Sequence, residues 1–323
     1  MRLTSVMQIS LCLVLGATID GRPEAWPGPT DRLLVIGGSS LYGQLVPDGR
    51  RGGLARRVTL FDSLRACRKF TLVVDAGDFT SHPGNQSPEA SEERWRRAVR
   101  TARTMRQIGY QVWTPGETEL WLGREGLEGI AQELGGRPVS ANLCDRSGER
   151  IFPASLVETI GRLRVGITGV TDPRSLDVTP DVSVAAAAAN DFRLLDPDSA
   201  LAVVVGELRE VTDVVVCLAH LPASGVRRLA ADVPGVSVFI SGHRPGFMPE
   251  PDVVEGVPIA RSGDFGRAVG LVDFVVEPGL GVREWAGECL PVDDRIREDP
   301  VLADSLRAFE ACESKGVRRS SHH

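Results

Sequence analysis

Three polar residues each follow a run of apolar, β-branched residues, at the point where a strand would end. Asp78 closes the segment VVDAGD, His220 closes VVVCLAH, and His243 closes VFISGH. A carboxylate and two imidazoles are the donors that oxygen/nitrogen metal sites use. One histidine at a strand end is more often a structural residue. Three such donors from three different strands favour a metal site instead.

The elements that position these residues alternate between strands and helices. Strands are expected at 33–36, 70–74, 111–115, 138–143, 163–170, 212–220 and 236–243, with a late pair of strands within 260–277. Helices are expected at 52–67, 91–108 with Ser91 as its N-cap, 199–210 and 300–313. This alternation predicts an α/β fold, in which ligands bind beyond the strand ends.

Composition narrows the classes of function. The chain has 323 residues, of which 42% are hydrophobic and 25% are charged, and a net charge of −6. These values are typical of a globular protein with one large domain or two modest ones. No basic patch gathers along the sequence, which argues against a nucleic-acid partner.

The N-terminus has the pattern of an export signal. Arg2 precedes the apolar run from Val6 to Ile19, and a polar segment rich in proline and glycine follows. We therefore expect residues 1–19 to be a signal peptide and the protein to reach the bacterial periplasm or the extracellular space. The alternative is a buried N-terminal strand or helix. Loss of Cys12 with the signal would leave five cysteines, outside any CxxC pattern, so one disulfide of unknown pairing is possible.

The loop GGSSLYGQL, residues 37–45, adds a more specific signal. With GGLARR, DAGD, MRQIGYQVWTPGETE, PVSANL, RVGITGVTDP, VVVCLAH, FISGH and RSGDFGRAVGLVDF, in this order, it resembles the calcineurin-like metallophosphoesterases. The likeness is to the catalytic domain of bacterial 5′-nucleotidases and UDP-sugar hydrolases, and it runs from about Leu33 to the final helix. It implies a four-layer α/β/β/α sandwich that binds two metal ions between two sheets.

One metal position implied by the resemblance has lost most of its ligands. The family binds this ion with an Asp and a His of the first loop, a bridging Asp, and the second His of Gly-His-x-His. The matching residues here are Ser40, Tyr42, Asp78 and Pro245. Only Asp78 is an ordinary ligand, so we expect this position to be empty, with Tyr42 filling the space rather than acting as a ligand.

The other implied metal position keeps a full set of donors. The residues that match its ligands are Asp78, Glu117, His220 and His243, with Glu117 in place of the family Asn. Two carboxylates and two imidazoles suit one divalent ion, Zn²⁺, Mn²⁺ or Fe²⁺. Two interpretations remain: a single-metal site strengthened by Glu117, or a relic in which both histidines bond to neighbouring groups.

The catalytic residues that the resemblance implies are also altered. Thr118 stands where the family has the His that assists phosphoryl transfer, and threonine is no acid near neutral pH. The catalytic group is therefore unknown, with Glu117 as a possible base. Asn142 matches a family residue that supports the site loops. Arg50, Arg51, Arg56 and Arg57 lie near the expected entrance, where solvated side chains are the simpler interpretation.

The expected domains are the signal at 1–19, a metallophosphoesterase-like domain at 30–290, and a C-terminal helix and tail at 291–323. We expect no C-terminal nucleotide-binding domain of the 5′-nucleotidase kind, so nucleotide specificity does not carry over. One hypothesis is an exported hydrolase of a small-molecule ester with weak or altered phosphoester hydrolysis. The alternative is an inactive module that binds a protein partner through the C-terminal helix. A lesser option adds redox chemistry at Cys144 or Cys217. The sequence leaves the oligomeric state open.

Overall fold

The computed structural model describes residues 30–81, 88–176, 188, 190–243 and 246–320, without the side chains of 88–90 and 314–320. The expected signal peptide at 1–19 and Pro245 lie outside these residues.

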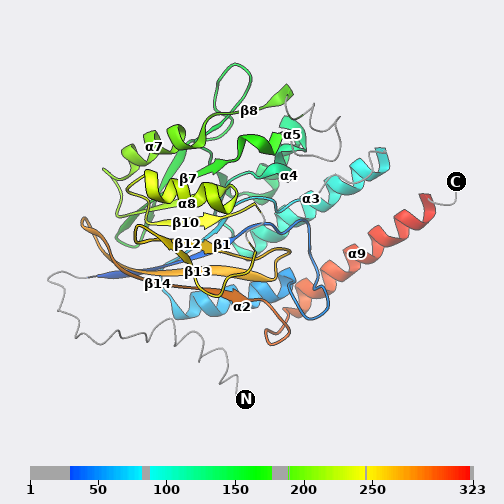
Figure 1. The fold of residues 1–323 in the computed structure, drawn as a ribbon. Helices are drawn as coiled ribbons and strands as arrows, with labels where there is room; N and C mark the ends of the chain where they lie inside the picture. Colours follow the sequence, from blue (N-terminus) through cyan, green and yellow to red (C-terminus); the bar gives the residue numbers. More distant parts are fainter. Residues whose placement is uncertain (1–29, 82–87, 177–187, 189, 244–245, 321–323) are drawn as a thin grey trace, which may run out of the picture.

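Two six-stranded sheets form the centre of the molecule (Figure 1). The first contains, in spatial order, β14 (Gly281–Pro291), β13 (Ala268–Glu277), β1 (Asp31–Gly38), β2 (Thr71–Asp75), β3 (Val112–Trp113) and β4 (Arg137–Pro138). The second contains β11 (Asp252–Val254), β12 (Val257–Arg261), β10 (Val238–Ser241), β9 (Val214–His220), β7 (Leu163–Thr171) and β6 (Ser155–Ile160). A small third sheet pairs β5 (Leu143–Cys144) with β8 (Arg193–Leu194).

Helices cover the outer faces of both large sheets. The described helices are α2 (Leu54–Cys67), α3 (Pro88–Ile108), α4 (Glu117–Leu120), α5 (Gly123–Leu134), the 3₁₀ helix η1 (Pro173–Leu176), α7 (Pro197–Leu208), α8 (Ala223–Asp232) and α9 (Pro300–Ser320). Residues of α2, α3, α5 and α9 share one core with the first sheet, and residues of α7 and α8 share another with the second sheet.

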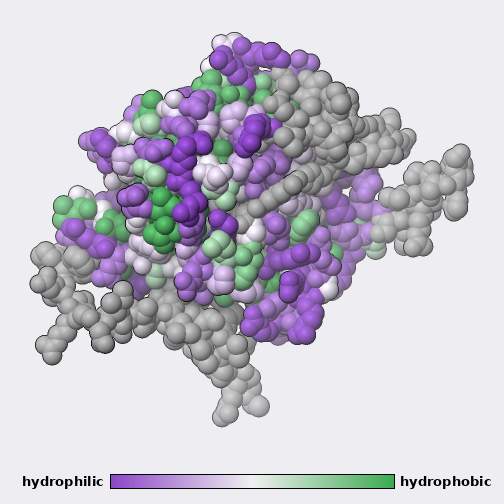
Figure 2. Space-filling model, in the orientation of Figure 1, coloured by the Kyte–Doolittle hydropathy of each residue, from purple (hydrophilic) through white to green (hydrophobic). Residues whose placement is uncertain are grey.

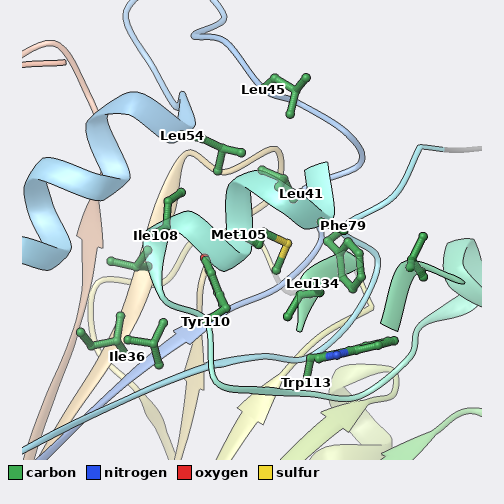
Figure 3. Close-up of a cluster of buried hydrophobic side chains, with 14 of the residues drawn as sticks. Ile36, Leu41, Leu45, Leu54, Phe79, Met105, Ile108, Tyr110, Trp113 and Leu134 are labelled. Carbon is green, nitrogen blue, oxygen red and sulfur yellow. The ribbon is translucent and has the colours of Figure 1, made fainter. Parts of the chain in front are cut away.

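The alternation of strand side chains explains this layering. In β1, Leu33 and Val35 join the core between the two sheets, while Leu34 and Ile36 join the core under the helices. Successive residues of a strand point to opposite faces, so a strand that is apolar throughout is covered on both sides. Figure 3 shows part of the helix-side core, where Ile36 lies with Met105 of α3 and with Tyr110. The predicted four-layer α/β/β/α sandwich is confirmed.

Parallel pairing brings the strand ends of interest together. β1, β2, β3 and β4 are parallel neighbours in the first sheet, and β7, β9, β10 and β12 are parallel neighbours in the second. The carboxyl ends of parallel strands lie at one edge of a sheet, where ligands of open α/β sheets bind. The loops after β2, β3, β9 and β10 carry the four predicted metal ligands.

Several local predictions were wrong. The helix expected from Ser91 begins at Pro88, so Ser91 lies inside α3 rather than at its cap. The segment 138–143 is not one strand but contributes to β4 and β5, which lie in different sheets. The last helix continues past 313 to Ser320, and it begins where expected, with the Asp299 carboxylate accepting from the backbone N–H of Leu302.

The surface shown in Figure 2 is mostly hydrophilic, with apolar residues in small separate groups. In the described part of the chain, no helix combines the length and apolar character that a membrane span needs. All five cysteines within the described ranges are free thiols, namely Cys67, Cys144, Cys217, Cys289 and Cys312. The disulfide that the sequence allows is therefore not formed among them. Burial raises the pKa of the Cys217 thiol, which makes it a poor nucleophile.

Candidate metal centre

Four loops at the carboxyl edge bring the predicted metal ligands together. Asp78 follows β2, and Glu117 is the first residue of α4, which follows β3. His220 is the last residue of β9, and His243 lies two residues beyond β10. Two of these strands belong to each large sheet. Four residues that are far apart in the sequence therefore lie close together in the fold.

Glu117 and the two histidines form a compact group, here named the Glu–His–His cluster. Glu117 Oε2 lies 3.1 Å from His220 Nε2 and 2.9 Å from His243 Nδ1. Each of the three residues can offer one ligand atom, with all three atoms within 4.8 Å of one another. Glu117 is 2% exposed and the His220 side chain 0%, but the His243 side chain is 23% exposed, so the cluster opens to solvent on the His243 side.

The ring of His220 is held in one orientation. Its Nδ1 lies 2.7 Å from the carbonyl oxygen of Ala76, which can only accept, so Nδ1 carries a proton and Nε2 faces the cluster. Such a bond fixes the tautomer of metal-binding histidines. The His243 ring packs edge-on against it, with the ring centroids 5.3 Å apart.

Two glycines permit this close packing. A Cβ on Gly116 would lie 2.5 Å from Asp78 Oδ1 and 2.6 Å from His220 Cε1. A Cβ on Gly242 would meet the Ala76 carbonyl oxygen and lie 2.8 Å from His220 Nδ1. The glycines that precede Glu117 and His243 in the sequence therefore allow the backbone to approach the site closely.

Asp78 stands beside the cluster with one oxygen unused. Its Oδ2 is 3.5 Å from His220 Nε2, and its Oδ1 accepts from the backbone N–H of Thr118 at 3.0 Å. Asp78 is fully buried, and its Oδ2 is a buried oxygen with no hydrogen-bond partner in the described structure. Buried carboxylate oxygens are normally satisfied. An orphaned oxygen facing an imidazole nitrogen fits a place for a cation.

The charges of the site follow from burial and pairing. Burial opposes ionisation of Glu117, but its bonds to His220 and His243 outweigh this and lower its pKa. Burial alone would lower the pKa of His220, yet the carboxylates of Asp78 and Glu117 raise it to about 10. Burial raises the pKa of Asp78. In the absence of metal, the cluster therefore holds an ionised Glu117 and a protonated His220. A metal ion would have to displace that proton.

Glu119 is a site residue that the sequence interpretation missed. Its Oε2 accepts from the backbone N–H groups of Asp78 at 2.8 Å and Gly116 at 2.9 Å. Its Oε1 accepts from the backbone N–H of Thr80 at 2.9 Å and from the hydroxyls of Thr80 and Thr118 at 3.0 Å each. The carboxylate thus ties the loop of Asp78 to the loop of Glu117. The signal was the last residue of GETE, an acidic residue in a buried segment.

Ser40 and Tyr42, in the first loop, are held by backbone hydrogen bonds to the loop of Asp78. The backbone N–H of Ser40 donates to Gly77 O at 2.8 Å, and that of Tyr42 donates to Asp78 O at 2.9 Å. Both residues have a φ of 51°, and Asp78 and His243 have φ values of 61° and 55°. Non-glycine residues are uncommon in this region of backbone conformation, and such residues gather at functional sites.

The Tyr42 side chain lies against the site. Its ring packs on Phe265 with the ring centroids 5.2 Å apart. Burial raises the pKa of the Tyr42 phenol, and the nearby charges of Asp78, Glu117 and Asp264 raise it further. The Tyr42 phenol is therefore neutral near neutral pH. Its role as a space-filling residue instead of a metal ligand stays a prediction.

Thr118 and Asn142 have structural contacts. The Thr118 hydroxyl donates to Glu119 and accepts from Thr80 at 3.0 Å, and the residue is 1% exposed. Asn142 bonds through its amide nitrogen to the carbonyls of Thr171 and Leu195 at 2.8 and 3.1 Å. Its oxygen accepts from the N–H of Thr171 at 3.0 Å. These bonds place Asn142 among the loops behind the site.

The simple interpretation of the arginines as solvated was wrong for two of them. Arg56 is 8% exposed and donates to the carbonyls of Arg50 and Gly52. Arg57 is 1% exposed and donates to the Tyr110 hydroxyl at 2.6 Å and to Ala268 O at 2.9 Å. Both guanidinium groups brace the protein interior and neither faces an entrance.

Comparisons with known proteins agree with this architecture. No family model matches the sequence. The chain is 25% identical over 287 residues to a 5′-nucleotidase of Diplobatis ommata, a match that covers 80% of this chain and 46% of that protein. It spans less than half the length of the curated relatives that it matches.

Among solved structures, the calcineurin-like phosphoesterase YfkN of Bacillus subtilis superposes with a TM-score of 0.76 at 18% identity, covering 90% of this chain and 100% of that one. A 5′-nucleotidase precursor of Thermus thermophilus gives a TM-score of 0.73 at 24% identity, covering 87% of this chain and 58% of that one. The protein thus has the fold of the calcineurin-like phosphoesterases. Over most of its length its sequence is similar to 5′-nucleotidases.

Proposed function

We propose that this protein is a hydrolase of phosphoesters that works with one divalent metal ion. The observation that carries the proposal is Glu117 Oε2, which lies within hydrogen-bond distance of both His220 and His243. Glu117 replaces an amide residue of the resembled family, and its carboxylate nevertheless faces the imidazoles. The orphaned oxygen of Asp78, next to His220, supplies a fourth donor.

The donor set fits Zn²⁺, Mn²⁺ or Fe²⁺. Two carboxylates and two neutral imidazoles balance the charge of one divalent ion. A bound ion at this place would supply Lewis-acid polarisation of a phosphoryl oxygen. The protein holds His220 through Ala76 and holds the two acidic loops through Glu119, so the donors are fixed before the ion arrives.

Activity should be weaker than that of a two-metal phosphoesterase. The first-loop positions hold a hydroxyl and a phenol, and the Thr118 hydroxyl is engaged with Glu119. Loss of one ion and of an acidic imidazole removes transition-state stabilisation worth roughly 10³-fold or more in rate. Glu117 itself is shared between two histidines, which leaves it poorly placed to act as a base.

Turnover of p-nitrophenyl phosphate and bis(p-nitrophenyl) phosphate, with and without added Mn²⁺, tests this proposal. We expect slow hydrolysis of at least one ester that depends on metal and is lost in His220→Ala. An Arg50→Gln variant, altered at a surface ion pair with Asp294, serves as the matched control and should keep its activity. Turnover that survives in His220→Ala would refute the role of the cluster.

A non-catalytic binding module is the second candidate, and two observations favour it. Tyr42 lies against the carboxylates where a second ligand set would stand, and Thr118 offers no acidic proton. In this case metal binds without turnover of any ester. The partner surface would be α9, on which Val301 is 76% exposed. A photo-crosslinker at residue 301 should then capture a defined partner that one at Leu280, 65% exposed on a distant turn, does not.

We also propose that the protein is exported, on the basis of the signal-like pattern of residues 1–19. The mass of the protein recovered from the periplasm of the expressing bacterium tests whether the signal is removed on export. A shortened N-terminus in the periplasmic fraction is the expected result, and full-length protein confined to the cytoplasm would contradict it.

A further inference from the structure

A cavity of about 410 Å³ is lined in part by the loop after β10, which also carries His243. Its lining includes Arg51, Phe247, Asp264, Arg267 and Asp293, with Ala268 and Val292 among the apolar residues. The volume falls in the range of small-molecule sites, which combine apolar walls with a few polar groups. We name it the Arg51 cavity.

Arg51 brings a positive charge without an ion-pair partner among the described residues to a cavity that Asp264 and Asp293 also line. Neighbouring arginines are paired: Arg50 with Asp294 at 2.5 Å, Arg267 with Asp48 at 2.7 Å, and Arg295 with Asp293 at 2.7 Å. The Arg51 side chain, by contrast, has no ion pair or hydrogen bond with any residue of the described ranges, and it is exposed.

The backbone of Arg51 is fixed although its side chain is free. Bridges join it to Asp48 on one side and to Asp293 on the other. A guanidinium on a fixed backbone loses less freedom when it binds an anion than one on a mobile loop.

Aromatic side chains accompany this charge. Phe247 lines the cavity and is 53% exposed, and Phe265, which adjoins the lining residue Asp264, is 39% exposed. The Arg267 guanidinium lies over the Phe265 ring at 5.2 Å from its centroid. Exposed rings beside a cavity provide flat apolar surfaces against which another ring can pack.

The cavity and the metal centre share one loop, and a second loop of the cavity contacts the loop of Ser40 and Tyr42. Phe247 lies four residues beyond His243, in the loop after β10. In the loop after β12, Phe265 packs on Tyr42, and its backbone N–H donates to Ser40 O at 2.8 Å. The Tyr42 backbone N–H in turn donates to Asp78 O. The cavity is therefore connected to the Glu–His–His cluster through the loop after β10 and through the contacts of Phe265.

We infer that the Arg51 cavity binds the leaving group of the ester, and that this group is an aromatic ring that carries an anionic substituent. The ring packs against Phe247 and the anion pairs with Arg51. This inference rests on the proposed function, since it names the class of substrate for the same site.

The test compares three phosphate esters on the metal-loaded full chain: 4-carboxyphenyl phosphate, phenyl phosphate and n-butyl phosphate. Arg51→Gln should lower kcat/KM for the carboxylated ester by about 3- to 10-fold and leave the other two within about twofold. Phe247→Ala should lower kcat/KM for both aryl esters by about 2- to 10-fold and spare the butyl ester. Comparing variants on each ester cancels the different intrinsic reactivities of the leaving groups.

Matched controls are Arg50→Gln, at the paired neighbour of Arg51, and Leu280→Ala, at a residue 65% exposed on the turn between β13 and β14. Neither should discriminate among the esters. Equal effects of Arg51→Gln and Arg50→Gln, or an equal effect of Phe247→Ala on all three esters, would overturn the inference.

Failure of the proposed function can be distinguished from failure of this inference. If no ester is hydrolysed, the intact esters are stable ligands, and calorimetry gives their dissociation constants for the same variants. The same pattern of fold-changes in Kd then supports the cavity as a binding site despite the lack of turnover. Unchanged dissociation constants in Arg51→Gln and Phe247→Ala, or no binding of any ester, would overturn it.

Discussion

The two halves of the candidate metal centre both have a backbone held by hydrogen bonds, but they differ in the donors that their side chains offer. Around Glu117, His220 and His243, donor atoms face one another at 2.9–3.1 Å. Around Ser40 and Tyr42, the backbone is equally well held, with hydrogen bonds to Gly77 and Asp78 and with left-handed conformations. Yet these positions present a hydroxyl and a phenol.

Ser40 and Tyr42 keep left-handed backbone conformations although their side chains offer no carboxylate or imidazole. Left-handed backbone at a non-glycine residue costs of order 1–3 kcal/mol and persists where surrounding contacts determine it. Here Glu119 supports both halves, because its carboxylate accepts from the loop of Glu117 and from the loop of Asp78, to which the backbones of Ser40 and Tyr42 donate. The scaffold can therefore keep one donor set while losing the other.

Removal of this shared brace should have the largest effect. Glu119→Ala would leave three buried backbone N–H groups and the Thr118 hydroxyl without their acceptor. We expect the free energy of unfolding to fall by about 3–5 kcal/mol. Urea unfolding in metal-free buffer measures it.

Glu125→Ala, at an exposed residue of α5, is the matched control and should change stability by no more than about 0.5 kcal/mol. A loss below about 1 kcal/mol in Glu119→Ala would mean that the two halves hold their shape without this carboxylate.

Rebuilding the altered half should change metal stoichiometry. In the double variant Ser40→Asp, Tyr42→His, the retained backbone would present a carboxylate and an imidazole beside Asp78, enough for an open site with three protein ligands. We expect about one additional ion per chain at saturating Mn²⁺. Elemental analysis beside both single variants measures this, and an unchanged metal content would show that the backbone of this half is not competent.

A separate prediction concerns pH dependence and Asp75, at the end of β2, which accepts from the N–H of Gly77 at 3.0 Å and so supports the turn before Asp78. Burial raises its pKa from 3.8 to about 8, although the Arg57 charge opposes the rise. The folded state then binds this proton more tightly than the unfolded chain. This group therefore makes the free energy of unfolding fall as pH rises from about 4 to 8.

Asp75→Asn keeps an acceptor for Gly77 and removes the titration. Relative to the natural protein, the variant should gain stability at pH 9 compared with pH 5. Thermal unfolding in the presence of a chelator at both pH values measures the difference. If the stability of both proteins changed with pH in the same way, the claim that Asp75 is protonated in the folded protein would be contradicted.

The sequence predicted the parts of this molecule that depend on local pattern. Runs of apolar residues predicted β1, β2, β7, β9 and β10. The polar residues that follow three of these runs predicted Asp78, His220 and His243 as site residues. Glu117 came from the resemblance of GETE to a family motif. Each of these follows from a short stretch of residues and from the rule that parallel strands place their carboxyl ends together.

The parts it missed depend on distant contacts. Arg57 can be buried because Tyr110 and Ala268, far along the chain, accept hydrogen bonds from its guanidinium group. Glu119 is a brace because Asp78 and Thr80 point their N–H groups at it from another loop. The segment 138–143 divides between β4 and β5 because its two ends pair with β3 and β8 in separate sheets. No local pattern contains this information.

The central claim is that Glu117, His220, His243 and Asp78 hold a single metal ion. Elemental analysis of the purified protein after incubation with Zn²⁺ or Mn²⁺ and removal of excess ion, beside Glu117→Ala and the control Glu125→Ala, tests it most directly. We predict about one ion per chain in the natural protein and in Glu125→Ala, and almost none in Glu117→Ala. Absence of metal from all three proteins, or equal metal in all three, would contradict the account.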